Sequence, residues 1–253
     1  MRIKSDLRYE LKYLLSREQM NALLPELLQH LDRDPHTDEL GLYPITSLYY
    51  DSPDLKAYWD KLEGHRNRRK VRVRVYGDDR VTTDTPAFVE IKERINSRIR
   101  KRRTALSYEE AVDFDEFDAL GSRPDQVNGA MLHEVYYLYR TLLLQPAGVV
   151  RYDRLALEGR DYYADLRVTF DTNVRGRAHD LTLLSTGMAD DRQVLPADRV
   201  ILEVKANESV PLWMVRMLSA HRCTHYRISK YCAVLERCSA IQSRQRIIFK
   251  PAI

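Results

Sequence analysis

The sequence predicts an α+β protein in which eight β-strands close into a tunnel, or barrel, with a charged interior and helices packed outside. Two observations lead to this prediction. Most of the predicted strands carry charged side chains on one face and aliphatic side chains on the other, and several amphipathic helices each need an apolar surface to cover. The alternative is a sandwich with its charges outside. Joining the apolar faces to each other would leave the helices little to pack on, so we prefer the tunnel.

The amino-terminal part predicts two strands, each followed by a helix. Arg8–Leu15 alternates charged and apolar side chains with the period of two that marks a half-buried strand. An S-x-x-Q capping box then begins a helix over residues 16–31. Ile45–Tyr50 is the second strand, and the Asp-Ser-Pro run after it opens a short helix that ends near Leu62.

The middle part predicts three strands. Arg66–Tyr76 is the clearest, because valines alternate with cations in the run KVRVRV. A polar loop leads to Ala87–Arg94, where charged residues again share one face. In Ser97–Leu106 cations occupy both faces, so alternation cannot identify the inner face, and a basic nucleic-acid-binding segment is the alternative interpretation there.

Helices are predicted over most of residues 107–145. An S-x-x-E capping box begins an acidic helix that runs from Ser107 to about Leu120. A loop over residues 121–129 precedes a helix over Ala130–Gln145, whose apolar side chains recur at helical spacing. Each of these helices has an apolar stripe to bury against the outside of the sheet.

The carboxyl-terminal part predicts the last three strands. They are Val149–Leu157, Leu166–Asp171 and Arg199–Ala206. A long loop over Val174–Ala197, with a hairpin as an option, separates the last two. Helices are predicted over residues 211–221 and 231–239.

The charged faces of the predicted strands hold many cations and few carboxylates. Uncompensated buried charge costs several kcal/mol per ion, so such an interior requires a polyanion. We expect the carboxylates to be too few to neutralise the cations, but sufficient to hold one Mg²⁺ or Mn²⁺ ion, which prefers oxygen ligands. A triphosphate or polyphosphate fits better than an extended nucleic acid, because valine and isoleucine, rather than stacking aromatics, separate the cations.

The length of 253 residues suits one large domain or two small ones, and the composition predicts a reducing cytoplasm. The three cysteines show no CxxC spacing. The amino terminus is too charged for a signal peptide. No apolar run approaches the roughly 20 residues that a membrane-spanning helix needs.

Nine motifs occur in order along nearly the whole chain. They are RYELKY (8–13), YYDSPD (49–54), VRVRVYG (71–77), FVEIKER (88–94), RKRR (100–103), RYDR (151–154), LRVTFD (166–171), LEVKA (202–206) and RISKY (227–231). Together they resemble the polyphosphate polymerase domain of the vacuolar transporter chaperone (VTC) family, one of the triphosphate tunnel metalloenzymes. The resemblance implies a single domain over residues 1–253. It also implies that this domain is an eight-stranded antiparallel tunnel that binds ATP or another nucleoside triphosphate, and inorganic polyphosphate, with Mn²⁺ or Mg²⁺.

The resemblance also implies roles for individual residues. The phosphate ligands would be Lys12, Arg72, Arg74, Lys92, Lys101, Arg103, Arg154, Arg167, Ser229 and Lys230. The catalytic residues among them would be Lys12, Arg72, Arg74, Lys92, Arg154 and Lys230. The metal ligand would be Glu203, with Glu10 and Glu90 as additional carboxylates.

One departure bears on the activity. Arg8 stands where the wider superfamily has the first glutamate of a Glu-x-Glu-x-Lys motif on its first strand. Losing this metal-binding carboxylate favours an ATP-dependent polyphosphate polymerase, here a stand-alone bacterial form. A metal-dependent triphosphatase of the same fold is the close alternative, and a non-catalytic module that binds polyphosphate or nucleic acid is the third.

Overall fold

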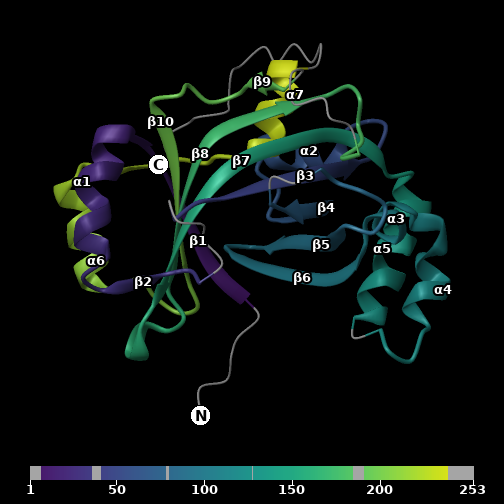
Figure 1. Cartoon of the computed structure of the whole chain (residues 1–253), viewed down its shortest axis with the longest axis horizontal. Helices are drawn as coiled ribbons and strands as arrows, with labels where there is room; N and C mark the ends of the chain where they lie inside the picture. The colour runs from purple at the N-terminus through teal and green to yellow at the C-terminus, as the bar shows by residue number, and fades with distance from the viewer. Residues whose placement is uncertain (1–6, 36–40, 78–79, 127, 185–190, 239–253) are drawn as a thin grey trace.

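A closed ring of eight antiparallel strands forms the centre of the protein, which confirms the predicted tunnel (Figure 1). The computed structural model describes residues 7–35, 41–77, 80–126, 128–184 and 191–238. Each strand of the ring is hydrogen-bonded to the next, and the pairing of the last strand with the first closes it. In ring order the strands are β7 (Gln145–Gly159), β3 (Tyr43–Asp51), β4 (Asn67–Tyr76), β5 (Pro86–Ile95), β6 (Arg98–Ser107), β1 (Leu7–Ser16), β10 (Arg199–Ala206) and β8 (Arg167–Arg177).

The strand register sets the inner face of the ring. Residues directly opposite each other in antiparallel strands point to the same face. Glu203 of β10 lies opposite Lys12 of β1, and Arg72 of β4 lies opposite Glu90 of β5. The charged faces of neighbouring strands therefore meet inside the ring, as their alternation predicts.

The hairpin that the sequence allowed in the long loop is present, whereas two other short strands and the early start of β7 were not predicted. β8 continues into the predicted long loop, where β9 (Arg192–Gln193) pairs with it. β2 (Leu31–Arg33) pairs with β7, so the helix predicted to reach residue 31 ends earlier. β7 begins at Gln145, where a helix was predicted to end, and β11 (Thr224–His225) pairs with β1. Runs of two or three residues are too short for alternation to reveal.

Two groups of helices cover the apolar outer face, on opposite sides of the ring in Figure 1. One group packs on β8 and β10 in a core that includes Leu23, Phe170 and Met214. The other packs on the valines of β4 and β5. The first group is α1 (Arg17–Leu27) and α6 (Leu212–Ala220), and the second is α3 (Tyr108–Val112), α4 (Phe117–Gly121) and α5 (Gly129–Leu142).

Both predicted capping boxes are present. The Gln19 backbone donates to the Ser16 hydroxyl at 3.1 Å, and the Ser16 backbone donates to the Gln19 side chain at 2.9 Å. Ser107 and Glu110 make the same reciprocal pair. The acidic helix that Ser107 begins is nevertheless broken, because Asp113 leaves helical geometry and the chain turns through a 3₁₀ segment, η1 (Phe114–Glu116), before α4. The rings of Phe114 and Phe117 lie in the core beyond this break.

The last helix, α7 (Lys230–Cys238), packs against the inner face of the ring, whereas the sequence predicted only outer helices. The Tyr231 ring stacks on Tyr49 of β3 with 5.0 Å between ring centroids. Val150 and Ile201, which lie on the same face of their strands as Arg154 and Glu203, join this core. Apolar packing thus fills part of the inner face, and charged side chains line the rest.

A buried carboxylate connects α7 to the ring and to α2 (Lys56–Leu62). Asp51, at the end of β3, accepts a hydrogen bond from the Tyr231 hydroxyl at 2.5 Å. The same carboxylate accepts from the backbone N–H groups of Ala57 and Tyr58 at 2.8 and 3.1 Å. Asp51 therefore fixes where α7 begins, and the first residue of α7 is Lys230.

Candidate functional site

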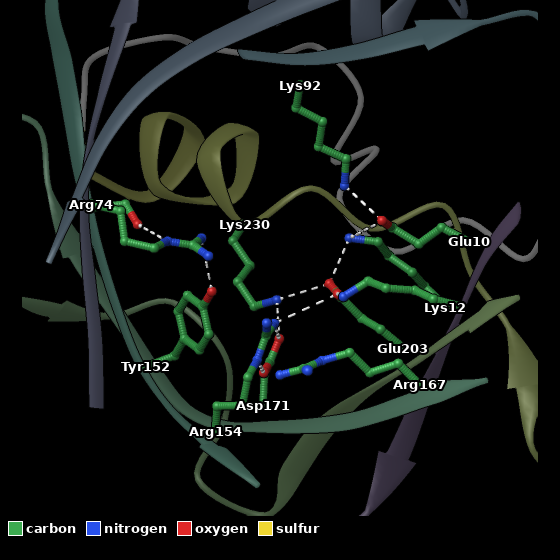
Figure 2. A network of polar contacts seen from close by, with 12 residues as sticks. Glu10, Lys12, Arg74, Lys92, Tyr152, Arg154, Arg167, Asp171, Glu203 and Lys230 are labelled. Atoms are coloured by element: carbon green, nitrogen blue, oxygen red, sulfur yellow. Dashed lines mark hydrogen bonds and ion pairs between the residues drawn. The ribbon is translucent and has the colours of Figure 1, made fainter. Parts of the chain in front are cut away.

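Four carboxylates and a larger set of cations meet inside the ring among the residues described. Figure 2 shows three of these carboxylates, Glu10, Asp171 and Glu203, with the cations around them. They belong to three groups of contacts. The Glu203 cluster contains Lys12, Lys205 and Lys230, together with Asp171 and Arg154. The Glu90 cluster contains Arg72, Arg74 and Lys101, and the third group joins Glu10 to Lys92.

Glu203 is at the centre of the first group. It is 4% exposed, and its carboxylate contacts the ammonium groups of Lys12, Lys205 and Lys230 at 2.8, 3.0 and 3.2 Å. Burial opposes the charged form of Glu203, but these cations outweigh it and hold its pKa well below the ordinary value. Glu203 therefore stays ionised, and its negative charge holds the surrounding cations in place.

Asp171 is a site residue that the sequence analysis missed. Its two carboxylate oxygens accept from Nε and Nη2 of Arg154 at 2.6 and 2.8 Å, and Lys230 contacts it as well. Burial raises the pKa of Asp171, but Arg154 and Lys230 outweigh it and leave the pKa lowered. The available signal was the LRVTFD motif, in which Asp171 shares a strand face with Arg167.

Glu90 organises the opposite side of the ring and is fully buried. Nη2 of Arg72 lies 2.6 Å from its carboxylate, and Lys101 also contacts it. This contact identifies the inner face of β6, which alternation could not: Lys101 points inward, and Arg102 points outward to Glu134 at 2.6 Å. The interpretation of this segment as a separate nucleic-acid-binding stretch is unnecessary, because its inward cation belongs to the ring.

Hydroxyl groups hold Arg72 and Arg74 of β4. Arg72 donates to the Tyr49 hydroxyl at 2.7 Å. Arg74 donates to the hydroxyls of Ser47 and Tyr152, each at 3.1 Å. Burial raises the pKa of Tyr49, but the neighbouring arginines outweigh it and lower the pKa to about 8. These contacts orient both guanidinium groups without neutralising them.

Three of the predicted phosphate ligands lie at the edge of the network. Arg167 reaches Asp34 at 2.6 Å and also contacts Glu158, near the end of the ring. The Arg103 guanidinium lies 4.8 Å from the centre of the Phe88 ring. Ser229 accepts hydrogen bonds from Lys70 at 3.0 Å and from a backbone N–H of α7 at 3.3 Å.

The carboxylates of Glu10 and Glu203 converge on one cation, the ammonium group of Lys12, at 3.2 and 2.8 Å. Glu10 also contacts Lys92 at 2.8 Å. Oxygen donors of this kind fit Mg²⁺ or Mn²⁺, which would take its remaining ligands from phosphates and water. Within the described ranges no three His, Cys, Asp or Glu side chains group into a complete metal site. Glu90 belongs to a different set of contacts, with Arg72 and Lys101.

Carboxylates compensate the interior cations more fully than the sequence led us to expect. Each of the four carboxylates contacts at least two cations. An anion that enters the ring therefore exchanges one set of ion pairs for another and does not meet bare charges. Such an interior can bind and align a chain of phosphates.

Comparison with known proteins identifies a family. The model of the VTC domain matches residues 7–238. A search of curated proteins found no match. No helix in the described part of the chain is both long and apolar enough to cross a membrane.

Solved structures offer distant likenesses. A candidate adenylate cyclase from Bacillus halodurans has 14% identity and a TM-score of 0.43, over 85% of this chain and 91% of that chain. A candidate adenylate cyclase from Vibrio parahaemolyticus has 10% identity and a TM-score of 0.41, over 95% and 97%. A candidate adenylyl cyclase from Hippeastrum, described as having a dominant triphosphatase activity, has 10% identity and a TM-score of 0.41, over 93% and 97%.

Proposed function

The chain belongs to the VTC domain family, and from this premise we propose that it is a polyphosphate polymerase that transfers the γ-phosphate of ATP to a growing polyphosphate chain. Membership confirms the resemblance carried by the nine motifs. The observation that supports the activity best is the set of lysines and arginines on the inner face of a closed ring, where they can surround a phosphate chain. A dependence on Mn²⁺ or Mg²⁺ is part of the proposal.

Positioning supplies most of the proposed catalysis. Hydroxyl groups hold Arg72 and Arg74 in place, so these guanidiniums are oriented before a substrate arrives. Lys12, Arg154 and Lys230, in the Glu203 cluster, lie across the interior from Arg74 (Figure 2). Phosphate oxygens would replace carboxylates as the partners of these cations and be held in line. Preorganised cations around a transferring phosphoryl group stabilise the charge that develops on it.

The acceptor needs no general base, because the terminal phosphate of a polyphosphate chain is already ionised. The protein therefore has to align the attacking oxygen with the γ-phosphate and leave ADP free to depart. Glu203, with Glu10, would hold the divalent metal, which supplies further charge neutralisation on the phosphates when bound. Lys12 lies between the two carboxylates and would move from them to a phosphate.

A triphosphatase is the second candidate, and the position of α7 favours it. Tyr231 and its neighbours occupy part of the inner face, next to Tyr49. This packing shortens the charged surface available to a long chain. With water in place of a polyphosphate acceptor, the same cations would support hydrolysis of a triphosphate.

One incubation separates the candidates. The protein is incubated with ATP and Mn²⁺ or Mg²⁺, polyphosphate is stained on a gel, and free orthophosphate is measured. We expect long polyphosphate and ADP. Orthophosphate without long chains would instead identify a triphosphatase. Tight binding of ATP that remains intact would contradict both enzymes and leave a binding module.

A further inference from the structure

A cavity of about 310 Å³ lies where β4 ends and β5 begins. Its walls include Tyr76, Phe88, Val75, Val81 and Pro86. The volume is at the lower end of the range for small-molecule pockets, and mostly apolar walls with aromatic rings are typical of them. Tyr76 and Phe88 lie on the inward faces of their strands, so the cavity opens beside the charged interior.

The two aromatic rings are available to a ligand. Tyr76 is 37% exposed, and its ring meets Phe88 edge-on with 5.5 Å between centroids. Tyr43 lies beside Tyr76, with 6.2 Å between ring centroids, and two other inward-facing tyrosines nearby have partners elsewhere. Tyr49 stacks on α7, and the Tyr152 hydroxyl accepts a hydrogen bond from Arg74.

Cations connect this cavity to the phosphate-binding interior. Arg74 lies directly opposite Phe88 in the β4–β5 register, and its guanidinium is 5.8 Å from the Tyr76 ring. Arg103 lies 4.8 Å from the Phe88 ring. Arg72, the next inward residue along β4, belongs to the Glu90 cluster. A row of guanidinium groups thus begins at the aromatic rings and continues into the ring of strands.

We infer that this cavity binds the nucleobase of the nucleoside triphosphate, while Arg103 and Arg74 receive the phosphates nearest the nucleoside. The inference rests on the proposed function and adds the place of the base. An aromatic base can stack on Phe88 or Tyr76 and also attract the Arg103 guanidinium. A ligand that is aromatic at one end and polyanionic at the other matches this surface, whereas a purely apolar ligand would leave the cations without a partner.

The position of the cavity gives the tunnel a direction. Tyr76 lies opposite Ile45 in the first half of β3, whereas α7 packs beside Tyr49 in the second half. The nucleoside therefore lies at one end of β3, and its phosphates extend toward the end where α7 begins. The Lys230 side chain reaches back from α7 toward the interior, where its ammonium lies 4.6 Å from the centre of the Tyr152 ring.

Recognition of the base would depend on stacking area rather than on hydrogen bonds. The Thr85 side chain, in the cavity wall, already bonds to Thr82. We therefore expect purine triphosphates to bind more tightly than pyrimidine triphosphates, without strong discrimination between adenine and guanine.

Isothermal titration calorimetry with ATP, CTP and inorganic tripolyphosphate tests this inference. Phe88→Ala should weaken ATP binding by about tenfold or more and change tripolyphosphate binding by less than about threefold. Phe88→Leu, which keeps the apolar packing without the ring, should give the same pattern if the alanine variant is unstable. Tyr9→Ala is the matched control, because Tyr9 also packs on an arginine, Arg98, at 5.3 Å, but on the outer face.

The outcomes distinguish this inference from the proposed function. Selective loss of ATP affinity in both Phe88 variants, with ATP preferred over CTP in the unaltered protein, supports the base site. Equal effects on ATP and tripolyphosphate, or an effect of Tyr9→Ala as large as that of Phe88→Ala, overturn the base site and leave the phosphate site standing. An unaltered protein that binds none of the three anions overturns the proposed function and this inference together.

A spectroscopic measurement gives a second test. Etheno-ATP, whose base is fluorescent, should lose intensity on binding if the base stacks on a ring. Excess tripolyphosphate should restore the fluorescence by displacing etheno-ATP from the phosphate-binding residues. Binding without any change of fluorescence, in the unaltered protein, would contradict stacking in the cavity.

Discussion

Asp171 and Arg154 form a two-bond ion pair across β7 and β8, with 2.6 Å between Nε and Oδ1 and 2.8 Å between Nη2 and Oδ2. Planar, bidentate pairs of this kind fix a guanidinium in orientation as well as in place. Asp171 also contacts Lys230, so one buried carboxylate positions two proposed phosphate ligands that come from distant parts of the chain.

Asp171→Asn should lower kcat by on the order of 10²-fold, because Arg154 and Lys230 lose the charge that aligns them. Steady-state kinetics with ATP measures the change, and circular dichroism checks that the variant is folded. Asp153→Asn is the control, since Asp153 precedes Arg154 on β7 but accepts from Asn173 at 3.0 Å, away from the cluster. An unchanged kcat in folded Asp171→Asn would remove Asp171 from the site.

Glu203→Ala should abolish turnover while leaving polyphosphate binding intact. The variant removes a proposed metal ligand but also frees Lys12, Lys205 and Lys230, which gain the ability to bind phosphate. Turnover across a Mn²⁺ titration, together with calorimetric binding of polyphosphate, measures both effects. Glu134→Ala, on the outer face, should change neither. Persistent turnover in Glu203→Ala would show that the metal assignment is wrong.

Lys101 and Arg102 are adjacent cations with opposite roles. Lys101→Ala should weaken polyphosphate binding and reduce the slope of log Kd against log salt by about one, because one phosphate contact is lost. Arg102→Ala should leave binding unchanged and lower the free energy of unfolding by about 1 kcal/mol or less, since it removes only ion pairs with Glu93 and Glu134. Equal effects of the two variants on binding would contradict the assigned inner face of β6.

Lys61 of α2, whose charge interacts with those of Lys12 and Lys70, should make polyphosphate binding depend on pH near neutrality. Burial lowers its pKa to about 7, and the nearby charges of Arg68, Lys70 and Lys12 act in the same direction, opposed by Cys232. Lys61 is charged below pH 7, so binding should tighten as the pH falls through this value. Calorimetry from pH 6 to pH 8 measures the trend, with proton uptake detected in buffers of different ionisation enthalpy. Lys61→Met should flatten it, and an unchanged profile in that variant would exclude Lys61 as the cause.

The same lysine affects folding with a defined sign. Its pKa of about 7 in the folded protein lies below the ordinary value of 10.5, so the folded state binds fewer protons than the unfolded state between these values. The contribution of Lys61 to stability therefore rises with pH across this window and is least favourable below pH 7. Lys61→Met should raise Tm more at pH 6 than at pH 9.

The strands of the ring were predictable from the sequence because alternation is a local property. Most strands have one apolar face and one charged face. The amphipathic helices need an apolar surface to pack on, so the apolar face is the outer one. The sequence predicted the helix α7 but not the face of the sheet that it covers, because all its side chains from Lys230 to Leu235 are buried. A helix buried all round has no stripe that tells which face of a sheet it covers.

A site residue was predictable from the sequence where its position on its own strand decides its role. It was not predictable where an interacting residue on another element decides that role. The inward orientation of Lys12 and Arg72 follows from the alternation of charged and apolar residues along their strands. The inner face of β6 depends on its register with β5, where Glu90 and Glu93 attract cations to opposite faces. The role of Asp171 depends on Arg154 and Lys230, which approach it from other elements. These relationships exist only after the ring has closed.

The first strand has consequences for how the protein is made. β1 pairs over most of its length with β10, so that Lys12 meets Glu203, and its pairing with β6 is limited to two residue pairs. During synthesis β1 is thus finished long before its main partner exists, and contacts between residues so far apart form late. While β1 is unpaired, the charges of Glu10 and Lys12 disfavour its pairing with a wrong strand or with another chain. Charges that line the interior of the finished protein thus also protect the nascent chain from aggregation.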